Sequence, residues 1–423
     1  MKNNDTKTIV FFYVNMTALG GAETLILRLM DWYLRHSYEV FLLTMHEINN
    51  SPILKDLKKI NNGEYYIYNR QVEKFLNNGV ELSFNTSDVL VLTMSLGDSL
   101  IHNKLLSGKK YGCRFIHRMY MIHPHCTTHL YADNDVSKNR YRFKFIIKPL
   151  LTFFIKEKIV FFMDEHTAAH AKNSYKIKDG DFTETIIRLP IIIKTDIVSK
   201  ARNKNVNILG ISRFEFPFKG YILGLLDTFN DLSSCFDNLY LTIIGYGVGE
   251  DIVNKKIAGF TEDVRKKINL IHQVPYSEIN DYIDKCDLFV GMGTTALDAA
   301  NMNKISIIPV AYQSGDLAFG FFHDNYKNLG AIYDKNLHYF HLGDLIREFL
   351  SFDDKSIIEK EDLVKSLITE HYNIDKIAPE IINLRYPQFP LHIKILKYVI
   401  STTIKAFIKI NMLFTGILKR PSG

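Results

Sequence analysis

The sequence predicts an α/β protein made of two doubly wound units in tandem, each with a mostly parallel sheet between two layers of helices. The chain has 423 residues, which is too many for one ordinary core and suits two domains of roughly 200 residues. Continuous apolar runs alternate with segments of helical period, as expected for parallel strands buried on both faces. The alternation restarts after a polar stretch at 200–207 (KARNKNVN), which we interpret as the linker.

In the first half, each predicted element follows from a local pattern. The apolar run at 8–14 predicts a first strand, a glycine-rich turn follows it, and an amphipathic helix is predicted over 23–36. Five further apolar runs predict strands at 39–45, 88–94, 114–117, 159–163 and 184–189.

The second half repeats this alternation. Its strands are predicted at 208–212, 239–244, 269–273, 288–291 and 305–310. The predicted limits are residues 1–200 for the first domain, 201–370 for the second, and 371–423 for a C-terminal tail. Ligands of doubly wound folds bind at the carboxyl ends of the strands, so two such domains facing one another would share a central cleft.

Composition narrows the possible classes of protein. The chain is 47% hydrophobic and 23% charged, with only 11 prolines and 23 glycines, which excludes a disordered or collagen-like protein. Its net charge of +6 is too small to indicate a nucleic-acid-binding protein, so no nucleic-acid partner is expected. No run of about 18 uncharged apolar residues predicts a membrane span. The run at 9–14 lacks the cleavage site of a secretory signal.

Neither a disulfide framework nor a metal site is predicted. Four cysteines are scattered without a CxxC pair, at Cys113, Cys126, Cys235 and Cys286, and free thiols in a reducing cytoplasm explain them most simply. Four histidines surround Cys126 in the segment 115–129 (FIHRMYMIHPHCTTH). Their spacing matches no four-ligand pattern, so we expect no metal cofactor.

The first candidate site is the glycine pair between the first strand and its helix. Gly20 and Gly21 would let the backbone approach a ligand closely, and the helix that follows presents free N–H groups and the positive end of its dipole. A tight turn explains the pair equally well, with Glu23 merely a favourable charge in the first helical turn. The pair belongs to neither a GxGxxG nor a Walker A pattern.

The second candidate site is the segment 210–220 (GISRFEFPFKG), at the end of the first strand of the second half. Arg213 and Lys219 on one loop can hold a diphosphate together, the first through directional paired bonds and the second as a point charge. They would stabilise the charge that develops on a departing phosphate without a metal. The alternative is that both residues are solvated surface cations. Their position at the end of a strand favours the binding role over this alternative.

Two further glycine segments follow predicted strands. Gly245 lies in the first (IGYG), which a plain strand-to-helix turn explains as well as a ligand does. In the second, at 290–300, the backbone and hydroxyl groups predict a phosphate nest formed by Gly291, Gly293, Thr294 and Thr295. Asp298 follows one helical turn later, where it either accepts hydrogen bonds from ribose hydroxyls or is an ordinary solvated carboxylate.

Together these segments resemble glycosyltransferases of the GT-B fold, and are most similar to family 4, the retaining enzymes that use nucleotide sugars. The resemblance covers roughly residues 8–370, and its marks are GGAET, SRFEFPFKG, LTIIGYG and VPYSEINDYIDKCDLFVGMGTTALDAANMNKISII. It implies two Rossmann-like domains that face a central cleft. It also implies metal-independent transfer of a sugar from a nucleoside-diphosphate donor.

The resemblance also implies roles for particular residues. The early glycine pair, Gly20 and Gly21, and the cations Arg213 and Lys219 would hold the donor diphosphate. The base would lie between Gln273 and Val274. A histidine after a strand of the first domain would face the donor sugar, and His117 is the best placed.

The chain departs from the family pattern of two glutamates eight positions apart. Asp298 takes the place of the second glutamate, and Val290 stands where the first, which helps hold the donor sugar, would be expected. Asn303 and Ile305 replace the usual glycine and proline. A catalytically silent relative that serves as a scaffold in a glycan assembly complex is therefore the alternative. The residues that an epimerase or a phosphorylase of this fold would need cannot be placed.

Two segments combine lysines with apolar residues. The segment 391–420 is predicted to lie at a membrane surface, because a lysine in mid-bilayer costs about 2.5–3.5 kcal/mol. The same lysine gains roughly 1 kcal/mol near anionic headgroups. A last helix that packs back on the first domain is the alternative. The segment 141–163, interrupted by Pro149, predicts a helix with a basic side toward the membrane. We expect a cytoplasmic, membrane-peripheral enzyme that acts on a lipid-linked glycan of a capsule, lipopolysaccharide O-antigen or exopolysaccharide.

Overall fold

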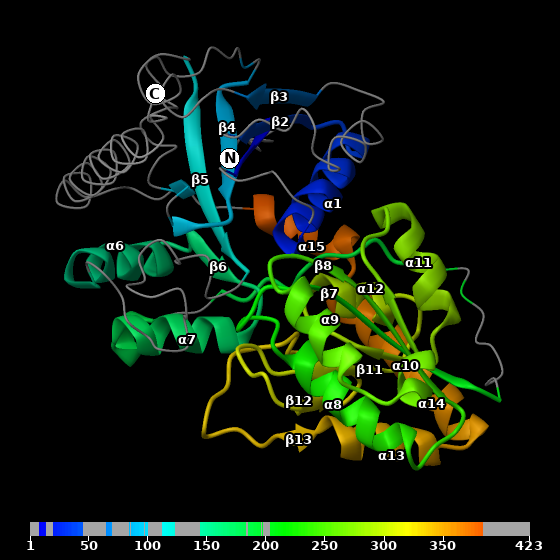
Figure 1. The fold of residues 1–423 in the computed structure, drawn as a ribbon. Helices are drawn as coiled ribbons and strands as arrows, with labels where there is room; N and C mark the ends of the chain where they lie inside the picture. The colour runs from blue at the N-terminus through cyan, green and yellow to red at the C-terminus, as the bar shows by residue number, and fades with distance from the viewer. Residues whose placement is uncertain are drawn as a thin grey trace, which may run out of the picture.

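The computed structural model describes residues 8–13, 20–44, 65–69, 84, 86–96, 98–99, 112–122, 144–182, 185–195, 197 and 204–383. The predicted membrane segment 391–420, the first half of the linker (200–203), and Cys126 with the neighbouring His123, His125 and His129 lie outside these residues. Figure 1 shows two lobes, the first drawn mainly in blue to blue-green and the second in green to orange.

The first domain is built on a parallel sheet. Among the described residues it has six strands in the order β3-β2-β1-β4-β5-β6, all parallel. Their bounds are β1 Thr8–Phe12, β2 Glu39–Thr44, β3 Tyr65–Asn69, β4 Asp88–Thr93, β5 Arg114–Met121 and β6 Val160–Phe162. The strand order reverses between β1 and β4, which is the switch point where ligands of doubly wound folds bind.

The second domain has the same plan with an antiparallel edge. Its seven strands follow the order β13-β12-β11-β10-β7-β8-β9, in which β12 and β13 are antiparallel to their neighbours. Their bounds are β7 Val206–Arg213, β8 Leu239–Tyr246, β9 Ile268–Ile271, β10 Leu288–Val290, β11 Ser306–Pro309, β12 Leu317–Phe321 and β13 Phe340–His341. The switch point here lies between β7 and β10. The predicted doubly wound α/β class is confirmed for both halves.

The helices cover both sheets. Among the described residues of the first domain they are α1 Gly21–Arg35, α6 Lys144–Lys156 and α7 Glu165–Tyr175. In the second half of the chain they are α8 Tyr221–Ser233, α9 Glu250–Ala258, α10 Glu262–Lys266, α11 Tyr276–Lys285, α12 Thr294–Ala300, α13 Leu342–Ser351, α14 Asp354–His371 and α15 Ile374–Ile382. Helix α7 begins directly after Asp164, whose carboxylate caps it by accepting a hydrogen bond of 2.6 Å from the Thr167 N–H.

Three predicted elements differ from the observed ones. The predicted strand at 184–189 is wrong: its described part is extended, but it makes only one parallel bridge, between Ile186 and Phe162. Strand β5 runs to Met121, four residues beyond its predicted end. Strands β3, β12 and β13 were not predicted. They lie toward the sheet edges, where pairing with a neighbouring strand defines a strand more than its own apolar pattern does.

The C-terminal part of the second half returns to the first domain. Helix α15, drawn in orange, lies beside α1 in Figure 1. The Tyr33 hydroxyl donates a 2.9 Å hydrogen bond to the Ala378 carbonyl, and the Trp32 indole N–H donates one of 2.7 Å to the Asp375 carboxylate. The chain thus returns to the first domain at α15. The sequence suggested such a return only later, in the segment 391–420.

One apolar core extends across both domains. It joins side chains of α1, such as Leu29 and Trp32, to Ala296 and Ala300 of α12 and to Ile377 of α15. A second core, which includes Val290, lies within the second domain. The shared core fixes α1 against the second sheet, and this contact positions the pocket described below.

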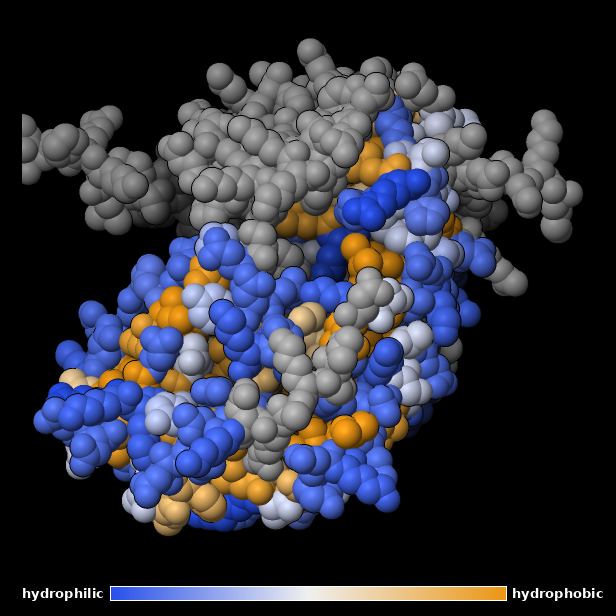
Figure 2. Space-filling view, turned by 90° about the vertical axis from the view of Figure 1, so that its right-hand side faces the viewer, coloured by the Kyte–Doolittle hydropathy of each residue, from blue (hydrophilic) through white to orange (hydrophobic). Residues whose placement is uncertain are grey.

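The predicted helix within 141–163 is confirmed as α6, with Pro149 inside it. Within the described ranges, no helix combines the length and apolar character needed to cross a bilayer. On the face in Figure 2, hydrophilic side chains predominate among the described residues, and apolar ones form separate patches. A membrane-facing side of α6 stays a prediction.

Gly224 provides a test of how α8 packs. An added Cβ at this position would lie 2.1 Å from the Gly315 carbonyl oxygen, which belongs to backbone. Helix propensity favours Gly224→Ala by about 1 kcal/mol, but overpacking against backbone outweighs this gain. We expect Gly224→Ala to lower the free energy of unfolding by about 2 kcal/mol in denaturant titrations. Gly259→Ala, at an exposed helix end with its nearest neighbour at 3.4 Å, should change it by less than about 0.5 kcal/mol.

Candidate functional site

A cavity of about 580 Å³ lies between the two domains. The first domain lines it with the ends of β1 and β4 and the first turn of α1. The second domain lines it with the ends of β7 and β8 and the start of α12. The volume is that of an ordinary small-molecule site, and the carboxyl ends of both sheets meet there, as doubly wound folds require of a ligand site.

Most of the residues singled out in the sequence line this cavity. They are Gly20, Gly21, Arg213, Lys219, Gly245, Gln273, Val274, Gly293, Thr294, Thr295 and Asp298. The fold thus brings together groups that are separated by up to 278 positions in the chain, from Gly20 to Asp298. The function of each stays a prediction.

Gly291 and His117 do not line the cavity. An added Cβ at Gly291 would lie 2.6 Å from the Phe289 ring, so this glycine serves packing behind the loop. His117 is 5% exposed, and its Nε2 lies 3.0 Å from the Ser99 hydroxyl oxygen. The expected placement of His117 after a strand fails because β5 continues past it; Ile122, just after the strand, lines the cavity instead.

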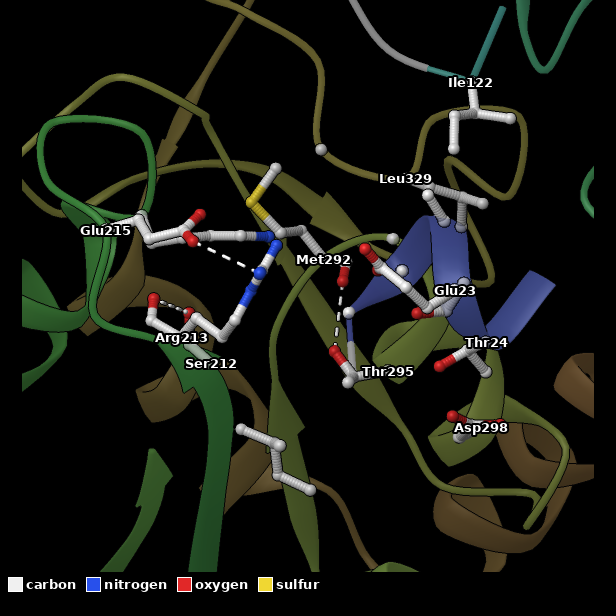
Figure 3. Close-up of a pocket in the computed structure, with 18 of the residues that line it drawn as sticks. Glu23, Thr24, Ile122, Ser212, Arg213, Glu215, Met292, Thr295, Asp298 and Leu329 are labelled. Atoms are coloured by element: carbon white, nitrogen blue, oxygen red, sulfur yellow. Dashed lines mark hydrogen bonds and ion pairs between the residues drawn. The ribbon is translucent and has the colours of Figure 1, made fainter. Parts of the chain in front are cut away.

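The two predicted cations both face the cavity. Arg213 is the last residue of β7, and its Nη1 lies 3.3 Å from Oε1 of Glu215 (Figure 3). The Lys219 ammonium lies 4.6 Å from the centre of the Phe218 ring. The loop is held by two backbone bonds, from the Lys219 N–H to the Glu215 carbonyl (2.8 Å) and from the Tyr312 N–H to the Phe218 carbonyl (3.1 Å).

The protonation of Lys219 is tuned by its surroundings. Burial of the ammonium is the main cause that lowers the pKa of Lys219 to about 7, and the neighbouring Arg213 charge lowers it further, while Glu215 opposes both. The side chain is therefore close to half charged at neutral pH. An anion bound beside it would restore the full charge.

Glu23 is a site residue that the sequence did not single out. It lines the cavity from the first turn of α1, is 5% exposed, and accepts a long hydrogen bond of 3.4 Å from the Tyr13 hydroxyl. Burial raises the pKa of its carboxyl group, and the N–H groups of Glu23 and Gly20 and the Arg213 charge lower it only in part. Its place in a GGAE turn was the available signal, but an acidic first turn is too common to distinguish it.

In the predicted phosphate nest at the start of α12, some of the polar groups already make hydrogen bonds within the protein. Gly293, with φ +66°, adopts a backbone that favours glycine, but its N–H already donates a 2.6 Å bond to the Leu329 carbonyl. The Thr295 hydroxyl donates to the Met292 carbonyl at 3.0 Å (Figure 3). Val290 is buried in the second core at the end of β10 and does not line the cavity.

Asp298 joins the two domains. Its carboxylate pairs with the Arg28 guanidinium of α1, and both residues are about 8% exposed. Asp298 also lines the cavity. An interdomain ion pair is thus its observed contact, and a bond to a ribose hydroxyl stays a prediction.

Further polar groups line the cavity without having been singled out. Ser95 and Asp98 follow β4, and Asp98 is 6% exposed. Tyr246 lies beside Gly245 at the end of β8, near the expected base site. In the part of the chain that the structure describes, no three His, Cys, Asp or Glu side chains gather so that they could hold a metal ion.

These features define the class of fold. Two domains, each with a parallel sheet and with the carboxyl ends of both sheets at one shared cavity, form the GT-B architecture, and the chain has this fold. No protein-family model and no curated protein sequence matches the chain.

Solved structures match it over nearly the whole of both chains. S. aureus TarM, solved with UDP and α-GlcNAc-glycerol, has a TM-score of 0.60 at 12% identity and covers 89% of this chain and 99% of its own. Anabaena HepE, solved with UDP and glucose, gives 0.58 at 10% identity, with coverage of 89% and 98%. The lipopolysaccharide outer core galactosyltransferase WaaB gives 0.50 at 14% identity, with coverage of 89% and 98%. At such identities the likeness establishes the fold.

The Arg28–Asp298 pair makes a testable contribution to stability. Asp298→Asn deprives a buried guanidinium of this counter-charge, so we expect the free energy of unfolding to fall by about 3 kcal/mol in denaturant titrations. Arg28→Met together with Asp298→Asn should cost less than the sum of the two single changes. As a control on the same helix, Asp31→Asn removes the exposed pair with Arg35 and should cost less than about 0.5 kcal/mol. If Asp298→Asn lowered the free energy of unfolding by no more than Asp31→Asn does, this account of the interface would be wrong.

Proposed function

We propose that this chain is a retaining glycosyltransferase, related to family 4, that transfers a sugar from a nucleoside-diphosphate donor to a lipid-linked glycan in cell-surface polysaccharide biosynthesis. The observation that carries the proposal is the pair of cations, Arg213 and Lys219, which one loop directs into a cavity shared by two Rossmann-like domains. Solvated surface cations would point outward. The GT-B neighbours solved with UDP support a nucleotide-sugar donor.

In the proposed reaction, the anomeric carbon leaves the β-phosphate of the donor and bonds to a hydroxyl of the acceptor. Arg213 and Lys219 stabilise the negative charge that develops on the departing diphosphate, which is the largest electrostatic requirement of the step. The departing phosphate takes the proton of the acceptor hydroxyl, so no protein nucleophile is needed. Gly20 and Gly21 let the α1 backbone approach the diphosphate, and Gly245, Gln273 and Val274 lie where the base would bind.

The proposal also specifies the acceptor substrate and the cellular location of the enzyme. The likeness to WaaB, a lipopolysaccharide galactosyltransferase, supports a glycan of the cell surface as acceptor. A lipid-linked acceptor requires the enzyme at a membrane, and the basic, apolar segment 391–420 would supply that contact at the cytoplasmic face. The proposed reaction needs no metal ion, because two side-chain cations would stabilise the charge on the departing diphosphate in its place.

The rival proposal, a silent scaffold of the same fold, rested on Val290. Val290 is buried in the second core and does not line the cavity, so the missing glutamate stays the observation that favours the scaffold. The decisive experiment incubates the protein with membrane lipid extract and single nucleotide sugars, the UDP-sugars first, and follows release of nucleoside diphosphate. Turnover of one donor supports the enzyme. Absence of binding by every donor in calorimetric titrations would favour the scaffold.

Lys219→Ala tests the role of the ammonium. Loss of one charge-stabilising donor typically lowers turnover by 10²- to 10³-fold, so we expect kcat to fall at least 10²-fold. Lys219→Arg, which keeps the charge, should retain clearly more activity than Lys219→Ala. Near-normal kcat in Lys219→Ala, measured as nucleoside diphosphate release, would count against the assignment.

The lowered pKa of Lys219 predicts that binding depends on pH. In the free protein a pKa of about 7 leaves Lys219 mostly neutral at pH 8. The Arg213 and Glu215 charges act on it in opposite directions. A bound diphosphate raises the pKa, so binding at pH 8 should take up roughly one proton, and affinity should fall as pH rises above 7. Calorimetry in buffers of different ionisation enthalpy measures the uptake. Lys219→Arg, which does not titrate, should show none.

A further inference from the structure

The Glu23 carboxylate lies where the first turn of α1 meets the Arg213 side chain. A Cβ added to Gly20 would lie 2.7 Å from Glu23 Oε2 and 2.8 Å from Arg213 Nη2, so these two atoms are at most 5.5 Å apart. Glu23 comes from the first domain and Arg213 from the second, and Figure 3 shows them entering the pocket from opposite sides. The chain therefore puts a carboxylate in front of the guanidinium expected to bind a phosphate.

The burial of Glu23 needs compensation. A carboxylate that is 5% exposed costs several kcal/mol of hydration unless nearby groups stabilise its charge. The groups that do so are the N–H groups at the start of α1, the Arg213 guanidinium and the Tyr13 hydroxyl. A helix N-terminus together with a guanidinium is also a favourable environment for a phosphate. Glu23 thus uses interactions of the kind that a bound diphosphate would use.

We propose that Glu23 is an internal substitute for a donor phosphate, which occupies the anion site of α1 and Arg213 in the empty pocket and is displaced when a nucleoside diphosphate binds. The inference rests on the proposed function, because it assumes that a diphosphate enters this pocket. In the empty state the Glu23 carboxylate lies near the partly exposed Arg213 guanidinium and, together with Glu215, compensates its charge. On binding, the ligand takes over this task and the carboxylate turns away from the added negative charge.

Displacement makes Glu23 a competitor of the ligand. Glu23→Gln keeps the size and polarity of the side chain and removes its charge. A carboxylate and a diphosphate that compete for the same guanidinium in a partly buried site repel each other, so we expect Glu23→Gln to bind diphosphates at least tenfold more tightly than the wild-type protein. The probes are inorganic pyrophosphate, which needs no base site, and UDP, GDP and ADP, all measured by isothermal titration.

Controls separate this effect from others. Glu262→Gln deletes an equal charge on the surface, where the residue pairs with Lys266 of the same helix, and should leave affinity within twofold of wild type. In an Arg213→Met background, Glu23→Gln should give little gain, because the shared partner is gone. If thermal unfolding shows that Glu23→Gln does not fold, Glu23→Ala replaces it, with the same expectation of tighter diphosphate binding.

The outcomes distinguish this inference from the function on which it rests. Diphosphate binding to the wild-type protein, with equal or weaker binding to Glu23→Gln, would overturn the displacement and leave the glycosyltransferase proposal standing. Failure of pyrophosphate and of every nucleoside diphosphate to bind any variant would overturn both. Tighter binding in Glu23→Gln that persists without Arg213 would also overturn the inference, because the competition would then not take place at Arg213.

Discussion

The pocket depends on how the first turns of α1 are held against the second domain. The buried Arg28–Asp298 ion pair, the apolar core shared by α1 and α12, and the bonds from Trp32 and Tyr33 to α15 all act on this one helix. Dehydrating an ion pair is costly, so such a pair is retained only where both charges are well compensated, which restricts the relative orientation of the two domains. With that orientation fixed, the N-terminus of α1 faces the ends of β7 and β8 across a space suited to a small molecule.

Within this space the charges are balanced closely. One loop supplies two cations, Arg213 and Lys219, and two carboxylates, Glu23 and Glu215, stand near the guanidinium. Burial limits how much charge the empty site can carry, which is why the pKa of Lys219 falls to about 7 and that of Glu23 rises. A site of this kind is weakly charged when empty, and an anion that enters it would raise the pKa of Lys219 and so add positive charge beside Arg213.

For the residues of the second domain, the family resemblance indicates which of them lie near the cavity, but it does not indicate what they contact. Asp298 lines the cavity as the family pattern implies, yet its observed partner is Arg28 rather than solvent. Gly293 immediately precedes α12, but its N–H already donates to the Leu329 carbonyl. Val290 occupies a core position and does not line the cavity. In each case the difference comes from a segment that packs against the site from elsewhere in the chain.

Local sequence patterns are enough to predict the alternation of strands and helices, the two doubly wound units and the loops at the carboxyl ends of the strands. These follow from local apolar periodicity and from glycines at turns, and in parallel sheets the end of a strand is where a ligand binds. Arg213 and Lys219 could therefore be placed in the pocket before the structure was known. The tertiary structure alone decided that Glu23 faces Arg213, that Asp298 pairs with Arg28, and that His117 lies inside β5. The first two depend on domain packing across 190 and 270 positions, which no local pattern encodes. The third depends on where a strand stops pairing with its neighbours, and this is decided by the sheet rather than by the strand.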